Sequence, residues 1–188
     1  MRLFAALVPS PDAVDDLDTF LDVRRGAADF RWAPAEQFHC TLAFMADVGE
    51  WRIDDYVTRL EQSLADVPAP QVHLARAVAF PDAATARVLA VGVEGALEVD
   101  DDALARVARK SRNAAVGSGM EVDGTRFRPH VTVARLRRPT DVTRWFQLLE
   151  GYDGPVWEAD RVTLLASHLR EGPRGRPRHE VVAEVPLG

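Results

Sequence analysis

Cysteine, lysine and long apolar runs are scarce in this chain of 188 residues. The single cysteine excludes a disulfide framework and any Cys-x-x-Cys zinc site. No stretch reaches the roughly 18 apolar residues typical of a membrane-spanning helix. The apolar opening segment 3–8 is too short for a secretory signal and has no cleavage site. We therefore expect a cytoplasmic protein.

Charge is abundant but unevenly spread. The net charge is −6, which disfavours a general electrostatic attraction to nucleic acid. Lys110 is the only lysine among 23 basic residues, and a preference for arginine is also typical of genome composition. Five aspartates and no basic residue fall within 12–22. Arginines gather in the second half, so a small polyanion could find a local basic site at Arg126, Arg128, Arg135, Arg137, Arg138, Arg144, Arg170, Arg174, Arg176 and Arg178.

Apolar periodicity divides the chain into alternating strands and helices. The length suits one domain, with no Pro/Gly/Ser-rich linker. Even-spaced or continuous apolar residues predict strands at 2–8, 30–33, 38–45, 72–80, 88–93, 130–136, 162–167 and 180–185. Helical spacing predicts a helix that begins at Pro11 after Ser10 as N-cap. It predicts further helices at 53–64, 97–116 and 142–149, and the helix at 97–116 is expected to end at Gly117. The stretch 172–177 is a loop between the last two strands. We expect an α+β fold with antiparallel or mixed sheets.

Two segments about half a chain apart share one pattern. They are Phe38-His39-Cys40-Thr41-Leu42 and Pro129-His130-Val131-Thr132-Val133. Side chains alternate along a strand, so the His and Thr of each copy share one face and the apolar residues the other. Two such strands placed side by side by an internal pseudo-repeat would form a groove with two imidazoles and two hydroxyls. A single His-x-Thr is more often structural, and a coincidence of composition remains the alternative for the pair.

These residue types suit phosphodiester chemistry. Histidine titrates near neutrality, so one imidazole can accept a proton from an attacking oxygen while the other donates to the leaving oxygen. In-line displacement at phosphorus needs both, on opposite sides. The hydroxyls of Thr41 and Thr132 can donate to the non-bridging oxygens, and Arg135 can add positive charge. No metal is required. Base stacking is possible for Phe44 and Phe80, and for Phe127 and Trp32.

The sequence resembles the 2H phosphoesterases over nearly its whole length, and within them the 2′-5′ RNA ligase-like RNA 2′,3′-cyclic phosphodiesterases. The resemblance rests on both motifs together with Arg2-Leu3-Phe4, Arg31-Trp32, Phe80-Pro81, Arg87-Val88-Leu89, Phe127-Arg128, Ala134-Arg135 and Leu165-Ala166-Ser167-His168-Leu169.

The resemblance implies one bilobal α+β domain over residues 1–188, in which two pseudo-symmetric sheets and flanking helices surround a central cleft. It implies hydrolysis of an RNA-terminal 2′,3′-cyclic phosphate to a 2′-phosphate without metal or other cofactor. His39 and His130 match the catalytic histidines, and Thr41 and Thr132 the threonines. It favours His39 as acid and His130 as base, an order that the residues themselves leave open. Reversible 2′-5′ RNA ligation is also implied as possible, and a monomer is expected.

Some positions depart from the family pattern. Cys40 replaces the usual leucine and should face the core, away from His39. His179 stands where tyrosine is common in the last hairpin. We expect His73, His168 and His179 to be surface or loop residues, since they lack ligand spacing. The alternatives to the RNA phosphodiesterase are a non-catalytic nucleotide or RNA-end binding module, and an enzyme acting on small cyclic nucleotides or 2′-5′ oligonucleotides.

Overall fold

A computed structural model describes residues 1–124, 126–169, 171–172 and 175–188. Thr125, Pro173 of the predicted loop, and Arg170 and Arg174 of the arginine group lie outside the described residues. Within the described ranges, no helix is long and apolar enough to cross a membrane.

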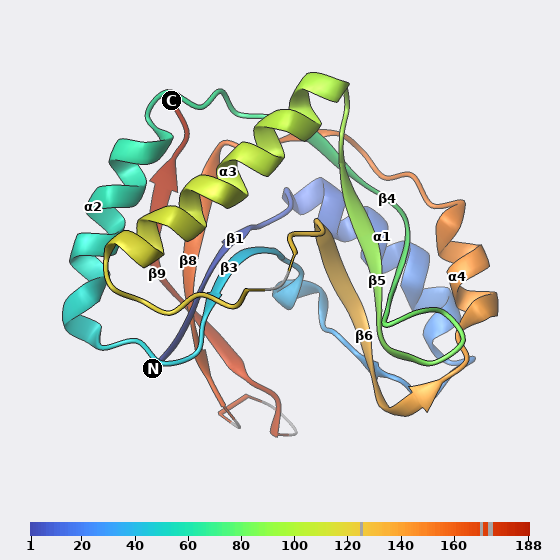
Figure 1. The fold of residues 1–188 in the computed structure, drawn as a ribbon. Coiled ribbons are helices and arrows are strands. Elements are labelled where there is room, and N and C mark those ends of the chain that lie inside the picture. The colour runs from blue at the N-terminus through green and yellow to red at the C-terminus, as the bar shows by residue number, and fades with distance from the viewer. Residues whose placement is uncertain (125, 170, 173–174) are drawn as a thin grey trace.

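The fold is α+β, as expected, and its strands form one strongly curled sheet (Figure 1). The order of eight strands is β7-β4-β5-β6-β3-β1-β8-β9, β2 pairs with β6, and all these pairings are antiparallel. The strands are β1 (Arg2–Leu7), β2 (Arg31–Trp32), β3 (Cys40–Met45), β4 (Gln71–Phe80), β5 (Ala86–Gly95), β6 (His130–Thr140), β7 (Trp157–Glu158), β8 (Arg161–His168) and β9 (Arg178–Pro186).

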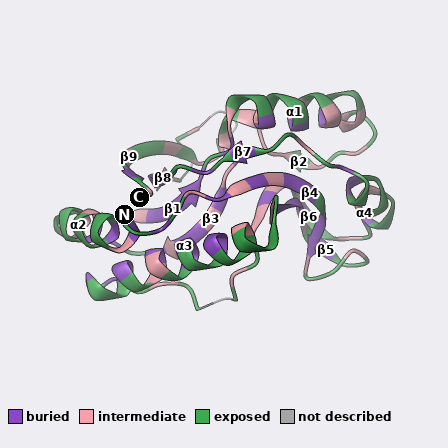
Figure 2. Cartoon of the chain, turned by 90° about the horizontal axis from the view of Figure 1, so that it is seen from above, coloured by how far each residue is buried: buried purple, intermediate pink, exposed green. Residues whose placement is uncertain are grey.

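In the part of the chain that the structure describes, four α-helices cover the sheet and bury their apolar faces on it. They are α1 (Pro11–Arg25), α2 (Ile53–Leu64), α3 (Glu98–Gly117) and α4 (Thr143–Glu150), with short 3-10 helices at Ala35–Gln37 and Glu50–Arg52. Helices α1 and α4 lie against β4, whereas α2 and α3 pack on each other and on β9, β3 and β5. Their inner sides are buried and their outer sides exposed (Figure 2).

Helix starts follow local sequence signals. At α1, the Ser10 hydroxyl accepts a hydrogen bond from the backbone N–H of Ala13, and Pro11 occupies the first helical position, as predicted. Helix α3 ends at Gly117, as predicted. Gly117 itself is still helical, and the left-handed glycine that follows the helix is Gly119, with φ of 73°. Glycine is favoured there because a side chain crowds the backbone at positive φ.

The two halves of the molecule meet where β3 lies antiparallel to β6. The two expected sheets are therefore joined into one path, with Cys40 paired to Val131 at the junction. Strand β7 was not predicted, because its two residues are too few to show a period. His39 immediately precedes the first residue of β3 rather than lying within it.

Close strand packing beside the second motif depends on a glycine. Gly92 on β5 pairs with His130 on β6 and with Ala75 on β4. A Cβ atom at Gly92 would lie 2.7 Å from the carbonyl oxygen of Ala75. The β4–β5 register shifts there, and Arg76 adopts a φ of 63°. The missing side chain thus lets β4 approach the strand that holds β6 in place.

Candidate active site

The two His-x-Thr segments come together at the centre of the molecule. Pairing of Cys40 with Val131 in antiparallel register places each histidine close to the threonine of the other segment. Cys40 and Val131 point into the core, and burial raises the pKa of the Cys40 thiol to about 12, so it is unsuited to act as a nucleophile. The side chains of His39, Thr41, His130 and Thr132 line the opposite face, in a cleft of about 650 Å³.

Both histidines are held in the same orientation. His39 Nδ1 lies 2.7 Å from the carbonyl oxygen of Gln37, and His130 Nδ1 lies 2.6 Å from that of Arg128. A carbonyl oxygen only accepts, so Nδ1 carries the proton in each ring. This leaves Nε2 of each ring to accept a proton when neutral, or to donate one when charged. Each acceptor lies two residues before its histidine, which repeats the pseudo-symmetry of the motifs.

An aromatic ring supports each histidine. The ring of Phe4 lies 4.8 Å from that of His39, and the ring of Phe80 lies 4.8 Å from that of His130. Phe80 was predicted to contact substrate, and it lines the cleft as well as packing on His130. Phe4 was missed, because the continuous apolar run of β1 gives no sign of which residue reaches the cleft.

Burial and neighbouring cations disfavour protonation of both histidines. The pKa of His39 falls to about 4, chiefly through burial and further through His179, Arg135 and His130, against the opposing hydrogen bond to Gln37. Burial also lowers the pKa of His130, with smaller contributions from Arg128 and Arg135. A bound anion would oppose these effects and favour the charged form of either ring.

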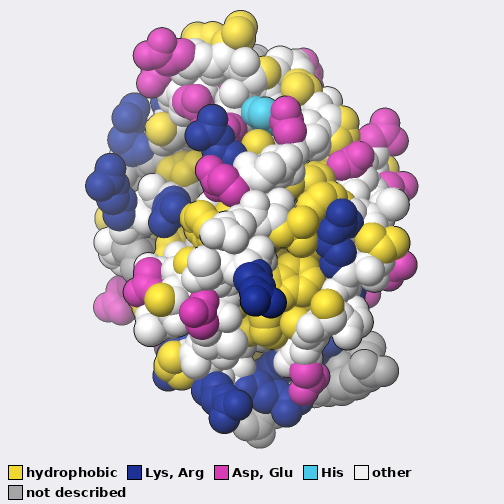
Figure 3. Space-filling view, turned by 90° about the vertical axis from the view of Figure 1, so that its right-hand side faces the viewer, with side chains coloured by type: hydrophobic (Ala, Val, Ile, Leu, Met, Phe, Trp, Pro, Cys, Tyr) yellow, Lys and Arg dark blue, Asp and Glu magenta, His cyan; other side chains and the backbone are white. Residues whose placement is uncertain are grey.

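The cleft is strongly basic although the molecule is acidic. Among its described lining residues the only acidic side chain is that of Asp123, whereas seven arginines line it: Arg2, Arg31, Arg112, Arg126, Arg128, Arg135 and Arg176. Of the arginines predicted to cluster, Arg137, Arg138, Arg144 and Arg178 do not line the cleft. Figure 3 shows one face of the molecule, with basic side chains at its lower edge and at several places above, and acidic side chains scattered among them.

The other predicted aromatic residues also reach the cleft. Phe44, Phe127 and Trp32 are half-buried and line it. The guanidinium of Arg2 lies 5.2 Å from the Phe44 ring centre, and that of Arg128 lies 5.3 Å from the Phe80 ring centre. Arginine beside a half-buried aromatic ring in a cleft suits a ligand that has both phosphate and base.

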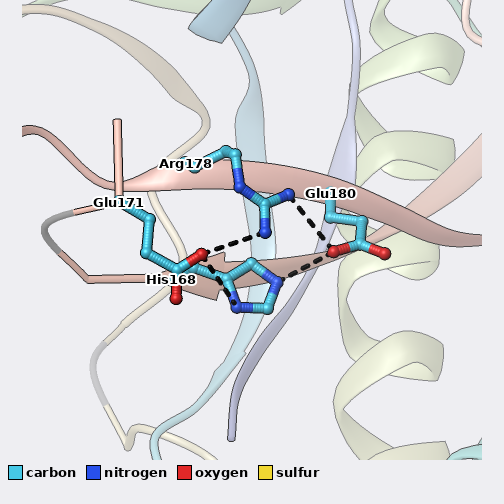
Figure 4. Close-up of polar contacts among 4 residues, drawn as sticks. All are labelled: His168, Glu171, Arg178 and Glu180. Atoms are coloured by element: carbon cyan, nitrogen blue, oxygen red, sulfur yellow. Dashed lines mark hydrogen bonds and ion pairs between the residues drawn. The ribbon is translucent and has the colours of Figure 1, made fainter. Parts of the chain in front are cut away.

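The remaining histidines separate into two groups. His73 contacts Asp153, and His168 contacts Glu180 and Glu171, all away from the cleft. Figure 4 shows the His168 cluster, in which Arg178 also bridges the two glutamates. For His179 the prediction of a surface or loop position is wrong, because its ring lines the cleft 5.4 Å from His39. Alternation along β9 sends His179 inward and its neighbours outward.

The described residues contain no evident metal site. Over the described ranges, no group of three or more His, Cys, Asp or Glu side chains is arranged to hold a metal ion. The cleft instead offers imidazoles, hydroxyls and guanidinium groups, which can supply proton transfer and positive charge directly.

Comparison with known proteins agrees with this architecture. A phosphodiesterase named for RNA 2′,3′-cyclic phosphate, from Thermotoga maritima, is 28% identical over 173 residues, covering 90% of this chain and 88% of its own. A protein of the same name from Archaeoglobus fulgidus is 26% identical over 140 residues, covering 73% and 74%. The crystal structure of TT0787 from Thermus thermophilus has a TM-score of 0.77 and 25% identity, covering 100% of this chain and 98% of its own. The crystal structure of LigT from E. coli in complex with 3′-AMP has a TM-score of 0.78 and 21% identity, covering 99% of this chain and 97% of its own.

The curled antiparallel sheet is the fold of a 2H phosphoesterase. The model of the 2′-5′ RNA ligase superfamily matches residues 11–171, and the chain belongs to that family.

Proposed function

We propose that the protein hydrolyses an RNA-terminal 2′,3′-cyclic phosphate to a 2′-phosphate, with His39 and His130 as the two proton-transfer groups. The observation that carries this proposal is the matched orientation of the two imidazoles, each donating from Nδ1 to a carbonyl and leaving Nε2 to the cleft. The names of the relatives from T. maritima and A. fulgidus support the same activity.

The chemistry divides between the two rings. The neutral imidazole accepts a proton from water as the water oxygen attacks phosphorus. The charged imidazole donates its proton to the 3′ oxygen as the P–O3′ bond breaks, which leaves the 2′-phosphate. Thr41, Thr132 and Arg135 would stabilise the charge that builds up on the non-bridging oxygens. Phe44 and Phe80 would contact the terminal nucleoside. The same steps with an RNA 5′ hydroxyl in place of water as the nucleophile would form a 2′-5′ bond and free the 3′ hydroxyl, and their reversal would cleave that bond.

The pKa values of His39 and His130 bear on which of the two rings acts as the acid. A pKa of about 4 leaves His39 neutral at pH 7 before substrate binds, which favours it as the base. This is the reverse of the order implied by the family resemblance. Because His130 is also held below its ordinary pKa, the bound phosphate must supply the negative charge that keeps either ring protonated.

The test is a short RNA with a 2′,3′-cyclic phosphate end, incubated with the purified protein in EDTA. We expect a 2′-phosphate product from the wild type, and a rate lower by about 10² or more for His39→Ala or His130→Ala. His73→Ala is the matched control, because that ring contacts Asp153 outside the cleft and should leave the rate unchanged. Loss of activity in EDTA, or full activity in both cleft variants, would refute the mechanism.

Two rival functions have distinct outcomes in the same assay. Tight binding of the RNA end without turnover would make the protein a binding module. Turnover of 2′,3′-cyclic mononucleotides or 2′-5′ oligonucleotides in preference to RNA ends would keep the chemistry and change the substrate. A cytoplasmic location and a monomeric state stay predictions from the sequence, the second to be checked by light scattering.

A further inference from the structure

The hairpin of β8 and β9 contributes a third histidine to the cleft. His179 pairs with Ser167 across the hairpin, and both side chains line the cleft. Its neighbours Arg178 and Glu180 project to the other face, where they join Glu171 and His168 in the ion-pair cluster of Figure 4. The hairpin therefore presents one imidazole inward and an interlocked set of charges outward.

The inward ring is held against His39 by packing on two sides. The His179 ring meets the ring of Phe4 edge-on at 5.0 Å and that of His39 at 5.4 Å. The hairpin is also tied to the first motif, because the side-chain amide of Gln37 donates to the carbonyl oxygen of Pro177 at 3.0 Å. The backbone carbonyl of Gln37 accepts a hydrogen bond from His39 Nδ1. Gln37 therefore contacts both the hairpin that carries His179 and the ring of His39.

The hydrogen bonding of His179 differs from that of the other two cleft histidines. Its Nδ1 is buried and has no hydrogen-bond partner within the described ranges, whereas Nδ1 of His39 and His130 each meets a carbonyl oxygen. A proton on that Nδ1 would be a buried donor without an acceptor, which is costly. Burial correspondingly lowers the pKa of His179. Arg135 and Arg176 also line the cleft, and their positive charge opposes a further cation there.

We propose that His179 is a third substrate-binding residue: a neutral imidazole that carries its proton on Nε2 and donates it in a hydrogen bond to an oxygen of the phosphate ester bound against His39. The chemical class of this ligand rests on the proposed function. His179 transfers no proton in the reaction. Its N–H fixes the ligand on the side of the cleft formed by the hairpin, and the lack of a partner at Nδ1 keeps the ring in the donating tautomer.

The first experiment measures binding, so that it does not depend on turnover. Adenosine 2′-monophosphate is titrated calorimetrically into the wild type, His179→Phe and His179→Gln. The phenylalanine keeps a planar ring against Phe4 but has no donor, and we expect its Kd to rise about tenfold. The glutamine amide can place a donor near the position of Nε2, and we expect it to recover most of the affinity. His73→Phe is the matched control outside the cleft.

The second experiment reads the tautomer directly. Long-range ¹H–¹⁵N spectra of histidine-labelled protein should show His179 neutral with its proton on Nε2 at pH 7 and above. A charged ring at pH 7, a proton on Nδ1, or wild-type affinity in His179→Phe would overturn the proposal, and so would failure of the wild type to bind the probe. A loss of kcat with a missing limb of the pH profile in His179→Phe would make it a proton-transfer group instead. Binding that depends on His179 without turnover of the cyclic phosphate would uphold this proposal and refute the proposed reaction.

Discussion

His39 and His130 share one hydrogen-bonding pattern but sit in different surroundings. His39 contacts Phe4 and His179, and burial dominates its low pKa. His130 packs on Phe80, beside the guanidinium of Arg128. Two groups that are alike in sequence can thus take different proton-transfer roles, because the environment of each ring sets the charge that it carries at a given pH.

The pH dependence of kcat/KM follows from these surroundings. Activity needs one neutral and one charged imidazole, so it falls at low pH when both are charged and at high pH when both are neutral. The pKa of His39 is about 4, and that of His130 lies below its ordinary 6.5. We therefore expect a bell with its rising limb near pH 4 and its falling limb below pH 6.5, measured on the cyclic-phosphate RNA.

Arg135 provides the internal check on that profile. Its positive charge lowers the pKa of both histidines, so Arg135→Gln should move both limbs to higher pH while weakening substrate binding. The profile of kcat should also lie at higher pH than that of kcat/KM, because bound phosphate stabilises a charged ring. An optimum of kcat/KM above pH 8 would show that histidines in this environment do not control the reaction.

The position of the second motif depends on how the strands β4, β5 and β6 pack together, rather than on a single contact. His130 begins β6, which pairs with β5, and β5 in turn pairs with β4 at Gly92. The close approach of Ala75 at that position means that the three strands are placed together. A change at Gly92, outside the cleft, can therefore move a cleft residue.

Gly92→Ala tests this dependence. The added Cβ would lie 2.7 Å from the Ala75 carbonyl oxygen, so one strand must shift. We expect a loss of about 1–3 kcal/mol in the free energy of unfolding, measured by urea denaturation. Gly26→Ala is the control, because no atom lies within 4 Å of its Cβ position and its φ is −64°. Equal stability of the two variants would mean that β4 and β5 adjust independently of each other.

Charge is organised at the scale of the whole molecule. A chain of net charge −6 places seven of its described arginines around one cleft, drawn from both halves of the sequence. The acidic remainder repels polyanions elsewhere, so binding should be confined to this cleft and to few phosphates. The sheet that carries these residues runs without interruption through both halves.

The salt dependence of RNA-end binding measures how many phosphates the cleft holds. Neutralising two to three phosphates of a single strand gives a slope of about −2 in a plot of log K against log salt concentration. Arg126→Gln should reduce the magnitude of the slope, since Arg126 lines the cleft. Arg137→Gln should leave it unchanged, since Arg137 is exposed and does not line the cleft. A slope as steep as that of an extended RNA-binding surface would contradict a local site.

The sequence by itself determined most elements and the chemistry of the two motifs. The α1 start at Pro11, the apolar face of α2 and the inward direction of Cys40 all follow from periods of 3.6 or 2 residues and from local capping. These are short-range effects that any segment carries with it. The pairing of the two His-x-Thr segments was expected from their repetition and from family resemblance, not from local geometry.

Only the tertiary structure decided which distant residues join those motifs. Three features depend on which strands become neighbours: Cys40 pairs with Val131, Phe4 packs on His39, and His179 points into the cleft beside His39. The alternating pattern of a strand decides which face each side chain takes, but which strands become neighbours depends on burial summed over the whole sheet. For the same reason Arg2, Arg31 and Arg112, scattered along the sequence, line one cleft while the clustered Arg137 and Arg138 do not.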